Sequence, residues 1–181
     1  PLVYRLLALA GMPTRIIDTY RKYQEALVIH NTIAGGIGRG FSRRCGIPQG
    51  CPLSMMIMAL LMRPWVIMIK AMGAIPVILA ADILVMTDGP GMLLKFGRCI
   101  NATHGYLCSI GAKIAEGKSM NFSSTEAARG WLRKTCWPLA GGAIKVVDHL
   151  RYLGSHLTTS TKGEHDTLKT RGTAGIAMTN K

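Results

Sequence analysis

At residues 46–54 the chain reads Gly-Ile-Pro-Gln-Gly-Cys-Pro-Leu-Ser, and a long apolar stretch follows at once. The two prolines fix the backbone φ angle and lack an N–H donor, whereas the two glycines let another molecule approach the backbone closely. Between them stands a single amide side chain, Gln49. We therefore predict a rigid loop that presents Gln49 and bare peptide groups to a flat partner.

The sequence around this loop is strongly basic. The 181 residues include 22 Lys and Arg against 9 Asp and Glu, which gives a formal net charge of +13. No acidic residue occurs between Glu25 and Asp82. Five basic residues lie in that interval: Arg39, Arg43, Arg44, Arg63 and Lys70. Such an excess favours a polyanionic partner, nucleic acid or an anionic membrane surface, although solvated basic residues also serve solubility alone.

Length and composition fit one domain with a real core, since 49% of the residues are hydrophobic and 17% are charged. The five cysteines are odd in number and form no Cys-x-x-Cys pair, which is typical of reduced thiols rather than of disulfides or a zinc site. No secretion signal opens the chain. We therefore predict an intracellular protein, nuclear or cytoplasmic, that is not secreted.

The most apolar stretch covers residues 53–69, and Arg63-Pro64 interrupts it after ten residues. A membrane-spanning helix needs roughly 20 apolar residues in a row. We therefore predict a buried core helix beginning at Ser54, and no membrane contact.

Hydrophobic periodicity and turn residues predict an α+β fold. Helices are expected at 2–10, from 13 onward, from 54 onward and at about 91–109. Strands are expected at 26–30, 40–45, 75–79, 83–86 and 118–122, and a hairpin from 143–147 with 151–157. The glycines of residues 35–40 indicate a flexible link, and residues 123–126 indicate a helix N-terminal cap with an acidic third position. This order favours an antiparallel sheet with helices packed on one face.

An aromatic stripe marks the second of these helices, with Ile16, Ile17, Tyr20 and Tyr23 on one side. Apolar residues at this spacing form one face of a helix. We interpret the stripe as core packing.

The loop at residues 46–54 resembles the loop before a palm helix in reverse transcriptases, above all those of non-LTR (LINE-type) retrotransposons. Residues 79–85, Leu-Ala-Ala-Asp-Ile-Leu-Val, resemble the family's Leu-Ala-Asp-Asp-Ile-Leu-Val box. Residues 111–120 are similar to the segment in which a lysine approaches the triphosphate, and 149–157 to the hairpin that steadies the primer end. The resemblance implies a truncated, degenerate palm and fingers fragment over residues 1–160, with a polar tail at 161–181.

The resemblance also implies roles for individual residues. Asp82 would be the catalytic and metal-binding carboxylate, with Mg²⁺ as the family's cofactor. Seven residues would bind template or nucleotide: Arg43, Arg44, Gly46, Pro48, Gln49, Gly50 and Lys118. The primer-contacting hairpin would carry Tyr152, Leu153 and Gly154. The implied partners are an RNA template, a DNA primer, a dNTP and the remainder of a retrotransposon polyprotein.

The metal site implied by the resemblance is incomplete. Nucleotidyl transfer uses two divalent ions, which hard oxygen ligands such as carboxylates hold. Ala81 stands where the first aspartate of the family box belongs, and Asp82 matches the second. If the register slides by one residue, Asp82 becomes the first and Ile83 replaces the second. In either register one carboxylate remains at the box.

The family's other metal-binding aspartate would precede Pro1, and the first methionine is Met12, so we expect this chain to be a fragment. Asp18 belongs to an amphipathic helix rather than a strand, and Asp88 to a turn, so neither replaces it. We therefore expect no DNA polymerisation, and poor solubility of the fragment by itself because a sheet edge is exposed.

Two other functions stay open. A non-catalytic RNA- or DNA-binding module would contact a base or sugar with Gln49. Its phosphate-binding residues would be Arg43, Arg44, Arg63, Lys118 and Arg151. A helix-rich protein could instead use its methionine-rich segment to pair with another chain or lie on a membrane, but the interrupted apolar run disfavours this function.

Overall fold

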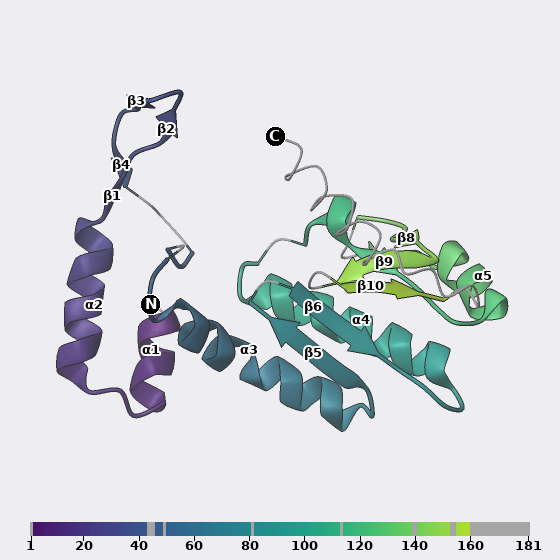
Figure 1. Ribbon diagram of the computed structural model, residues 1–181. Helices are drawn as coiled ribbons and strands as arrows, with labels where there is room; N and C mark the ends of the chain where they lie inside the picture. Colours follow the sequence, from purple (N-terminus) through teal and green to yellow (C-terminus); the bar gives the residue numbers. More distant parts are fainter. Residues whose placement is uncertain are drawn as a thin grey trace. The chain divides into compact units, whose positions relative to one another are not determined.

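The computed structural model (Figure 1) describes residues 2–42, 46–48, 50–80, 82–112, 114–138, 141–152 and 155–159. The described residues form helices and short strand pairs, so the expected α+β class is confirmed. The chain divides into two compact units, Pro1–Met86 and Thr87–Lys181.

Three helices build the first unit: α1 (Leu2–Leu9), α2 (Thr14–Ala26) and α3 (Ser54–Ala71). They fall where the sequence predicts them, and α1 packs against both of the others. The core of this unit joins residues of all three helices and of the loop before α3: Leu7, Ile17, Tyr20, Cys51 and Ile57. Burial of this cluster therefore fixes the loop at residues 46–54 against α1 and α2.

The aromatic stripe on α2 divides between the core and the surface. Ile17 and Tyr20 are buried as expected. Ile16 and Tyr23 are exposed to 42% and 51%, so the interpretation of the whole stripe as core packing is wrong for these two residues. A helix of 3.6 residues per turn rotates these positions away from the line of contact with α1 and α3.

Helix α3 does not end at Pro64. Arg63-Pro64 interrupts the apolar run, but the helix contains Pro64 and continues to Ala71. Trp65 and Ile69 beyond the proline are fully buried, and burial of such side chains offsets the backbone cost of an interior proline. Met55 and Ile67 are exposed, so only part of α3 is a core helix.

Helix α3 runs through Arg63 and Pro64, although these two residues interrupt its apolar stretch. Among the described residues, α3 is the one helix long and apolar enough to cross a membrane, judged by length and composition alone. Core helices of soluble proteins pass the same test. The length and composition of α3 alone are therefore weak evidence for a membrane-spanning helix.

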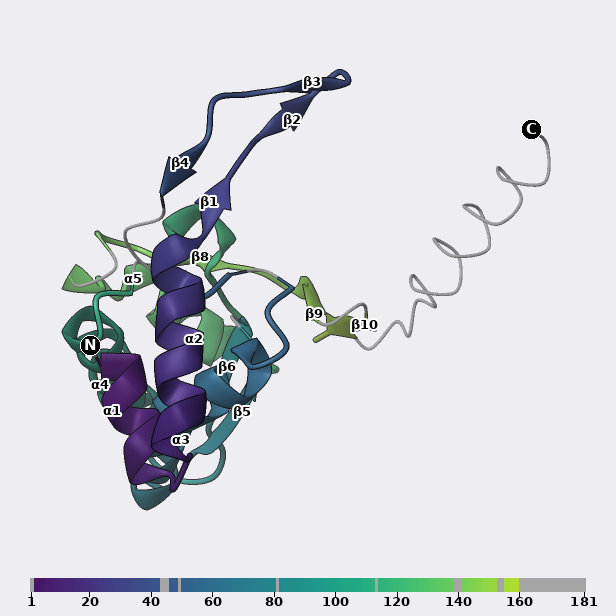
Figure 2. The same ribbon diagram turned by 90° about the vertical axis from the view of Figure 1, so that its left-hand side faces the viewer.

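An extended arm follows α2 (Figure 2). Strand β1 (Val28–Ile29) pairs with β4 (Phe41–Ser42), and β2 (Thr32–Ile33) pairs with β3 (Gly36–Ile37), both antiparallel. The glycine-rich segment is thus a hairpin rather than a flexible link. Its two-residue turn has positive φ angles at Ala34 (48°) and Gly35 (81°), as a type I′ turn requires.

A second hairpin is the last element of the first unit along the chain. Strand β5 (Ile75–Leu79) pairs antiparallel with β6 (Asp82–Met86), and Leu79 lies opposite Asp82. The two β-rich runs predicted from the sequence are therefore confirmed as paired strands.

The second unit begins with α4 (Met92–Ser109), at the predicted position. Its other elements are the 3₁₀ turn η1 (Glu116–Lys118), β7 (Met120–Asn121), α5 (Glu126–Lys134), β8 (Lys145–Val146), β9 (His149–Tyr152) and β10 (Ser155–Thr158). Leu132, Trp137 and Ile144 form its buried core, and Phe96 and Trp131 pack against it.

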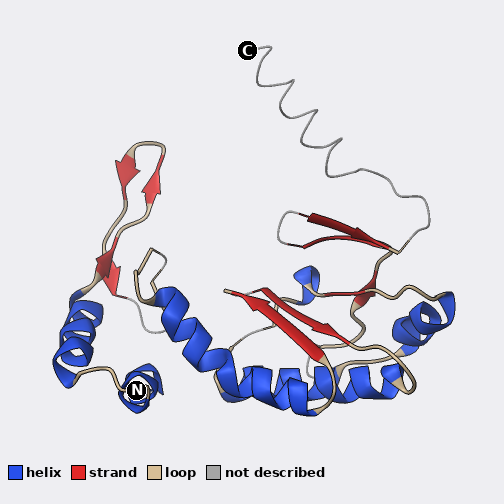
Figure 3. Ribbon diagram, turned by 60° about the horizontal axis from the view of Figure 1, so that its bottom comes forward, coloured by secondary structure: helices blue, strands red, loops and turns tan. Residues whose placement is uncertain are grey.

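Three expectations for the strands and caps are wrong. The hairpin expected from 143–147 and 151–157 does not form, because β8 pairs in parallel with β7 and β9 pairs with β10. The cap of α5 is Thr125, whose hydroxyl accepts a hydrogen bond from the Ala128 N–H, so Glu126 follows the cap directly instead of lying three residues on. The strands of Figure 3 form separate two-stranded pairs among the described residues, not one antiparallel sheet.

Candidate nucleic-acid interface

The loop at residues 46–54 is anchored on its inner side. Pro48 and Cys51 are buried, the Cys51 N–H donates to the Pro48 carbonyl at 3.2 Å, and the Cys51 Sγ contacts the Tyr20 hydroxyl at 3.4 Å. Gly46 and Gly50 are exposed. The loop therefore has a packed inner side and an exposed glycine backbone, as its sequence predicts.

The two exposed glycines have backbone angles that favour glycine. Gly46 has φ 85° and Gly50 has φ 78°, in the left-handed region that side-chain-bearing residues rarely occupy. Open space surrounds the position of a Cβ at both, so conformation rather than crowding requires glycine. Gln49 lies between these glycines in the sequence, and Arg43 and Arg44 precede them. All three are expected to contact template, and all three lie outside the described residues.

Asp82 lies at the tip of the β5–β6 hairpin. It is the first residue of β6 and its side chain is exposed. Ala80 beside it is one of two non-glycine residues with positive φ in the described chain, at 51°. Ala81, at the place of the family's first aspartate, lies outside the described residues. The hairpin thus presents one described carboxylate at its tip.

The residues at this tip do not fit a pair of magnesium ions. Across the described residues, no group of three His, Cys, Asp or Glu side chains is arranged to hold a metal. Two octahedral Mg²⁺ ions need several shared carboxylate oxygens. A single exposed carboxylate offers too few ligands, and we assign no metal-dependent step to Asp82.

Relief of the turn strain should stabilise this hairpin. Ala80→Gly is expected to raise the free energy of unfolding by about 1 kcal/mol, because a left-handed conformation costs a non-glycine residue about 1–2 kcal/mol and glycine loses part of that gain through its greater freedom when unfolded. Urea unfolding followed by circular dichroism measures the change. Ala59→Gly, in the interior of α3, is the matched control and should destabilise instead. Equal effects of the two changes would contradict the assignment.

The remaining predicted site residues belong to the second unit. Lys118 ends the turn η1 and is exposed, and its N–H donates to the Ala115 carbonyl at 3.0 Å. Tyr152 ends β9 and is half-buried. Leu153 and Gly154 lie outside the described residues, between the paired positions Tyr152 and Ser155. Strands β9 and β10 pair antiparallel at this point of the chain.

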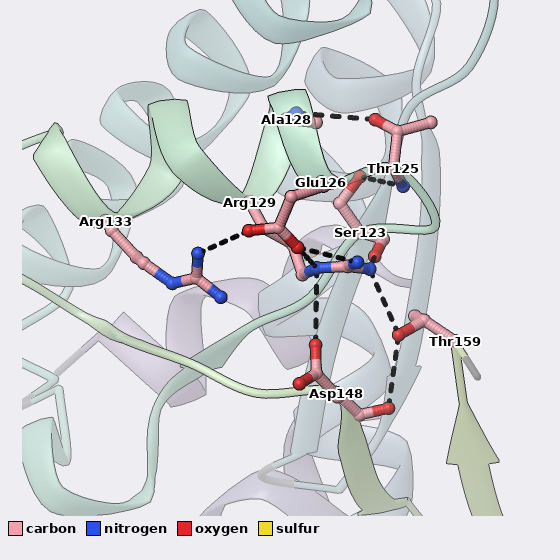
Figure 4. A network of polar contacts seen from close by, with 8 residues as sticks. All are labelled: Ser123, Thr125, Glu126, Ala128, Arg129, Arg133, Asp148 and Thr159. Carbon is pink, nitrogen blue, oxygen red and sulfur yellow. Dashed lines mark hydrogen bonds and ion pairs between the residues drawn. The ribbon is translucent and has the colours of Figure 1, made fainter.

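A polar network that the sequence analysis missed surrounds the start of α5 (Figure 4). Arg133 Nη1 lies 2.7 Å and Arg129 Nη2 lies 2.8 Å from the two carboxylate oxygens of Glu126. These hydrogen bonds, that from Arg133 first, lower the pKa of the Glu126 carboxyl. The two arginines follow the glutamate by three and seven residues, and residues at this spacing lie on the same face of a helix. This spacing could have predicted the cluster from the sequence.

Arg129 connects α5 to the segments on either side of the β9–β10 hairpin. Its Nε lies 3.3 Å from the Asp148 carboxylate, and its Nη1 donates to the Ser123 carbonyl at 2.7 Å and to the Thr159 hydroxyl at 3.3 Å. The Arg129 side chain is only 16% exposed. Arg129 therefore serves the fold and contributes no accessible charge to a phosphate-binding surface.

Acid should destabilise the second unit through His104. This α4 residue is 6% exposed, and its Nδ1 has no hydrogen-bond partner among the described residues. Burial lowers its pKa from the ordinary value of about 6.5. Below about pH 6.5 the unfolded chain therefore binds more protons than the folded chain. As the pH is lowered from there, the free energy of unfolding should decrease by up to about 1.4 kcal/mol per pH unit, until the pH reaches the lower pKa of the folded state.

Urea unfolding between about pH 5 and 8 measures this slope. His104→Leu should reduce the slope, whereas Leu94→Ala, at an exposed α4 position without a titratable group, should leave it unchanged. An unchanged slope in the His104 variant would contradict the prediction.

Comparison with known proteins identifies no relative. No protein-family model, no curated protein and no solved structure matches the chain. The resemblance to reverse transcriptases therefore rests on the sequence motifs at residues 46–54, 79–85, 111–120 and 149–157.

Proposed function

We propose that this chain binds nucleic acid as a reverse-transcriptase-like palm and fingers fragment and does not polymerise DNA. The observation that carries the proposal is the anchored loop at residues 46–54. Its inner side packs through Pro48 and Cys51, while Gly46 and Gly50 are exposed on the outer side, with open space where a Cβ would stand. Exposed glycines without a side chain permit the close approach of a sugar–phosphate chain or a base pair.

The charge around the loop supports a polyanionic ligand. Arg39, Arg63 and Lys70 are exposed, and all belong to the interval from Glu25 to Asp82 that has no acidic residue. The ion pairs of the described residues use arginines outside this interval. The exposed charges in the interval can therefore neutralise phosphates, which is the main source of affinity in such complexes.

The binding half of the proposal is tested by salt dependence. Fluorescence anisotropy should detect binding of a labelled RNA–DNA hybrid at low salt. With about three phosphate contacts, affinity should fall roughly 40-fold between 50 and 200 mM salt. Arg63→Glu should weaken binding and reduce the slope, whereas Arg5→Glu, an exposed α1 residue outside the interval, should have a smaller effect. No binding at low salt would overturn the proposal.

The catalytic half is tested by primer extension. With Mg²⁺ or Mn²⁺ present, the chain should give no extended product, because Asp82 is the one carboxylate of the box. Ala81→Asp should also give no product, since the family's third carboxylate is still missing. Processive extension by the wild-type chain would show that the metal site is complete.

A non-catalytic binding module unrelated to polymerases would use the same basic residues. The two functions differ in the ligand they prefer. A reverse-transcriptase-like fragment should bind a primer–template with an unpaired template overhang more tightly than single strands of equal length, whereas an unrelated module has no reason to do so. The anisotropy experiment with both ligands therefore separates them.

A further inference from the structure

An apolar groove lies beside the loop at residues 46–54. Its volume is about 540 Å³, and it is widely open to solvent. It is lined by Arg15, Ile16, Thr19, Tyr20, Tyr23 and Leu53. Five of these residues come from α2 and the sixth lies directly before α3, so one wall of the groove is part of the loop itself. Leu53 is the lining residue that belongs to a sequence motif.

Tyr23 is the outer member of a row of aromatic rings. Its ring centroid lies 6.4 Å from that of Tyr20, with an interplanar angle of 31°, and Tyr4 meets Tyr20 edge-on at 6.4 Å. Tyr20 is buried and held by its contact with Cys51, whereas Tyr23 is 51% exposed. The inner ring is thus fixed by the core, and the outer ring offers a supported aromatic surface to a ligand.

One charged residue lines the groove, and acidic residues lie near it on the same helix. Arg15 is the charged residue that lines it, and it is exposed. The nearby acidic residues on α2 are Asp18, which pairs with Arg21 at 3.8 Å, and Glu25, which is exposed. The Leu53 wall belongs to the interval without acidic residues. The groove thus combines apolar side chains, the exposed ring of Tyr23 and the guanidinium of Arg15. This combination is complementary to a planar heterocycle that carries a phosphate.

We propose that this groove holds an unpaired nucleobase of a bound strand, stacked on Tyr23, with Arg15 contacting its phosphate. This inference rests on the proposed function, because the same strand would pass over the loop. Bases that are not paired stack on exposed aromatic rings and on arginine planes, and such stacking tolerates any sequence. A base within a blunt duplex cannot enter the groove, so the site distinguishes single-stranded from fully paired ligands.

The test compares a single-stranded RNA with a blunt RNA–DNA duplex of the same length, by fluorescence anisotropy at low salt. Tyr23→Ala should weaken single-strand binding about 5- to 150-fold, the range measured for loss of one base–aromatic stack, and leave duplex binding within about twofold. Tyr23→Phe should bind as the wild type does. Ile33→Ala, an exposed apolar residue on the arm, is the matched control and should change neither affinity.

Tyr23→Leu separates stacking from packing, because it keeps the apolar bulk and removes the aromatic ring. It should show the same selective loss, and it decides the question even if the alanine variant loosens the fold. If wild-type protein binds RNA and the Tyr23 variants bind equally well, the groove site is wrong while the proposed function stands. If wild-type protein binds no RNA, the proposed function fails first. If the variants instead abolish self-association measured by sedimentation, with RNA affinity unchanged, the groove is a protein interface and the inference is overturned.

Discussion

Replacement of Trp137 by alanine is expected to lower the free energy of unfolding by about 3 kcal/mol. Trp137 is 2% exposed, and its ring meets Phe96 at 6.0 Å and Trp131 at 6.3 Å, both edge-on. Truncation of a buried tryptophan costs about 3–5 kcal/mol through lost transfer energy and a residual cavity. The buried Nε1 has no hydrogen-bond partner among the described residues, and its removal offsets part of that cost. The expected loss therefore lies at the lower end of the range.

Two further variants make this prediction sharp. Trp137→Phe keeps an aromatic ring in the cluster and removes the unpartnered N–H, so it should cost much less than the alanine variant. Leu94 on α4 is 70% exposed, so the free energy of unfolding of Leu94→Ala should stay within about 0.5 kcal/mol of that of the wild type. Urea unfolding followed by circular dichroism measures all three. A loss below about 1 kcal/mol for Trp137→Ala would show that this aromatic cluster does not form the core.

Local patterns of the sequence predict helices α1 to α4 and the β5–β6 hairpin well. Helix α4 and the β5–β6 hairpin appear where periodicity and turn residues place them, because both depend on neighbouring residues. Strand pairing over a longer distance is different. The parallel contact of β7 with β8 joins residues about 25 positions apart, and no local pattern encodes that choice. The missed Arg129–Asp148 contact is of the same kind.

In the candidate site, too, the sequence predicts local features but not those that depend on tertiary packing. The sequence identifies Gly46, Gly50 and Asp82 as a loop and a hairpin tip, and the structure exposes all three. It does not identify Tyr23 as a surface residue, because the spacing of Ile16, Ile17, Tyr20 and Tyr23 shows only that they share a helix face. Which of the four the core covers depends on where α1 and the loop pack, and that is a tertiary property.

The replacement of Pro64 by alanine is expected to raise the free energy of unfolding by about 3 kcal/mol. Pro64 is exposed in the interior of α3, where proline is about 3 kcal/mol less favourable than alanine. Its ring removes the N–H that would bond the carbonyl of Leu60, and alanine restores that donor without changing any buried surface. Urea unfolding measures the gain, and Arg63→Ala, at the preceding exposed position, should stay within about 0.5 kcal/mol. A loss of stability in Pro64→Ala would contradict a continuous α3. It would favour instead a helix that ends at Pro64, and with it a shorter core helix behind the loop at residues 46–54.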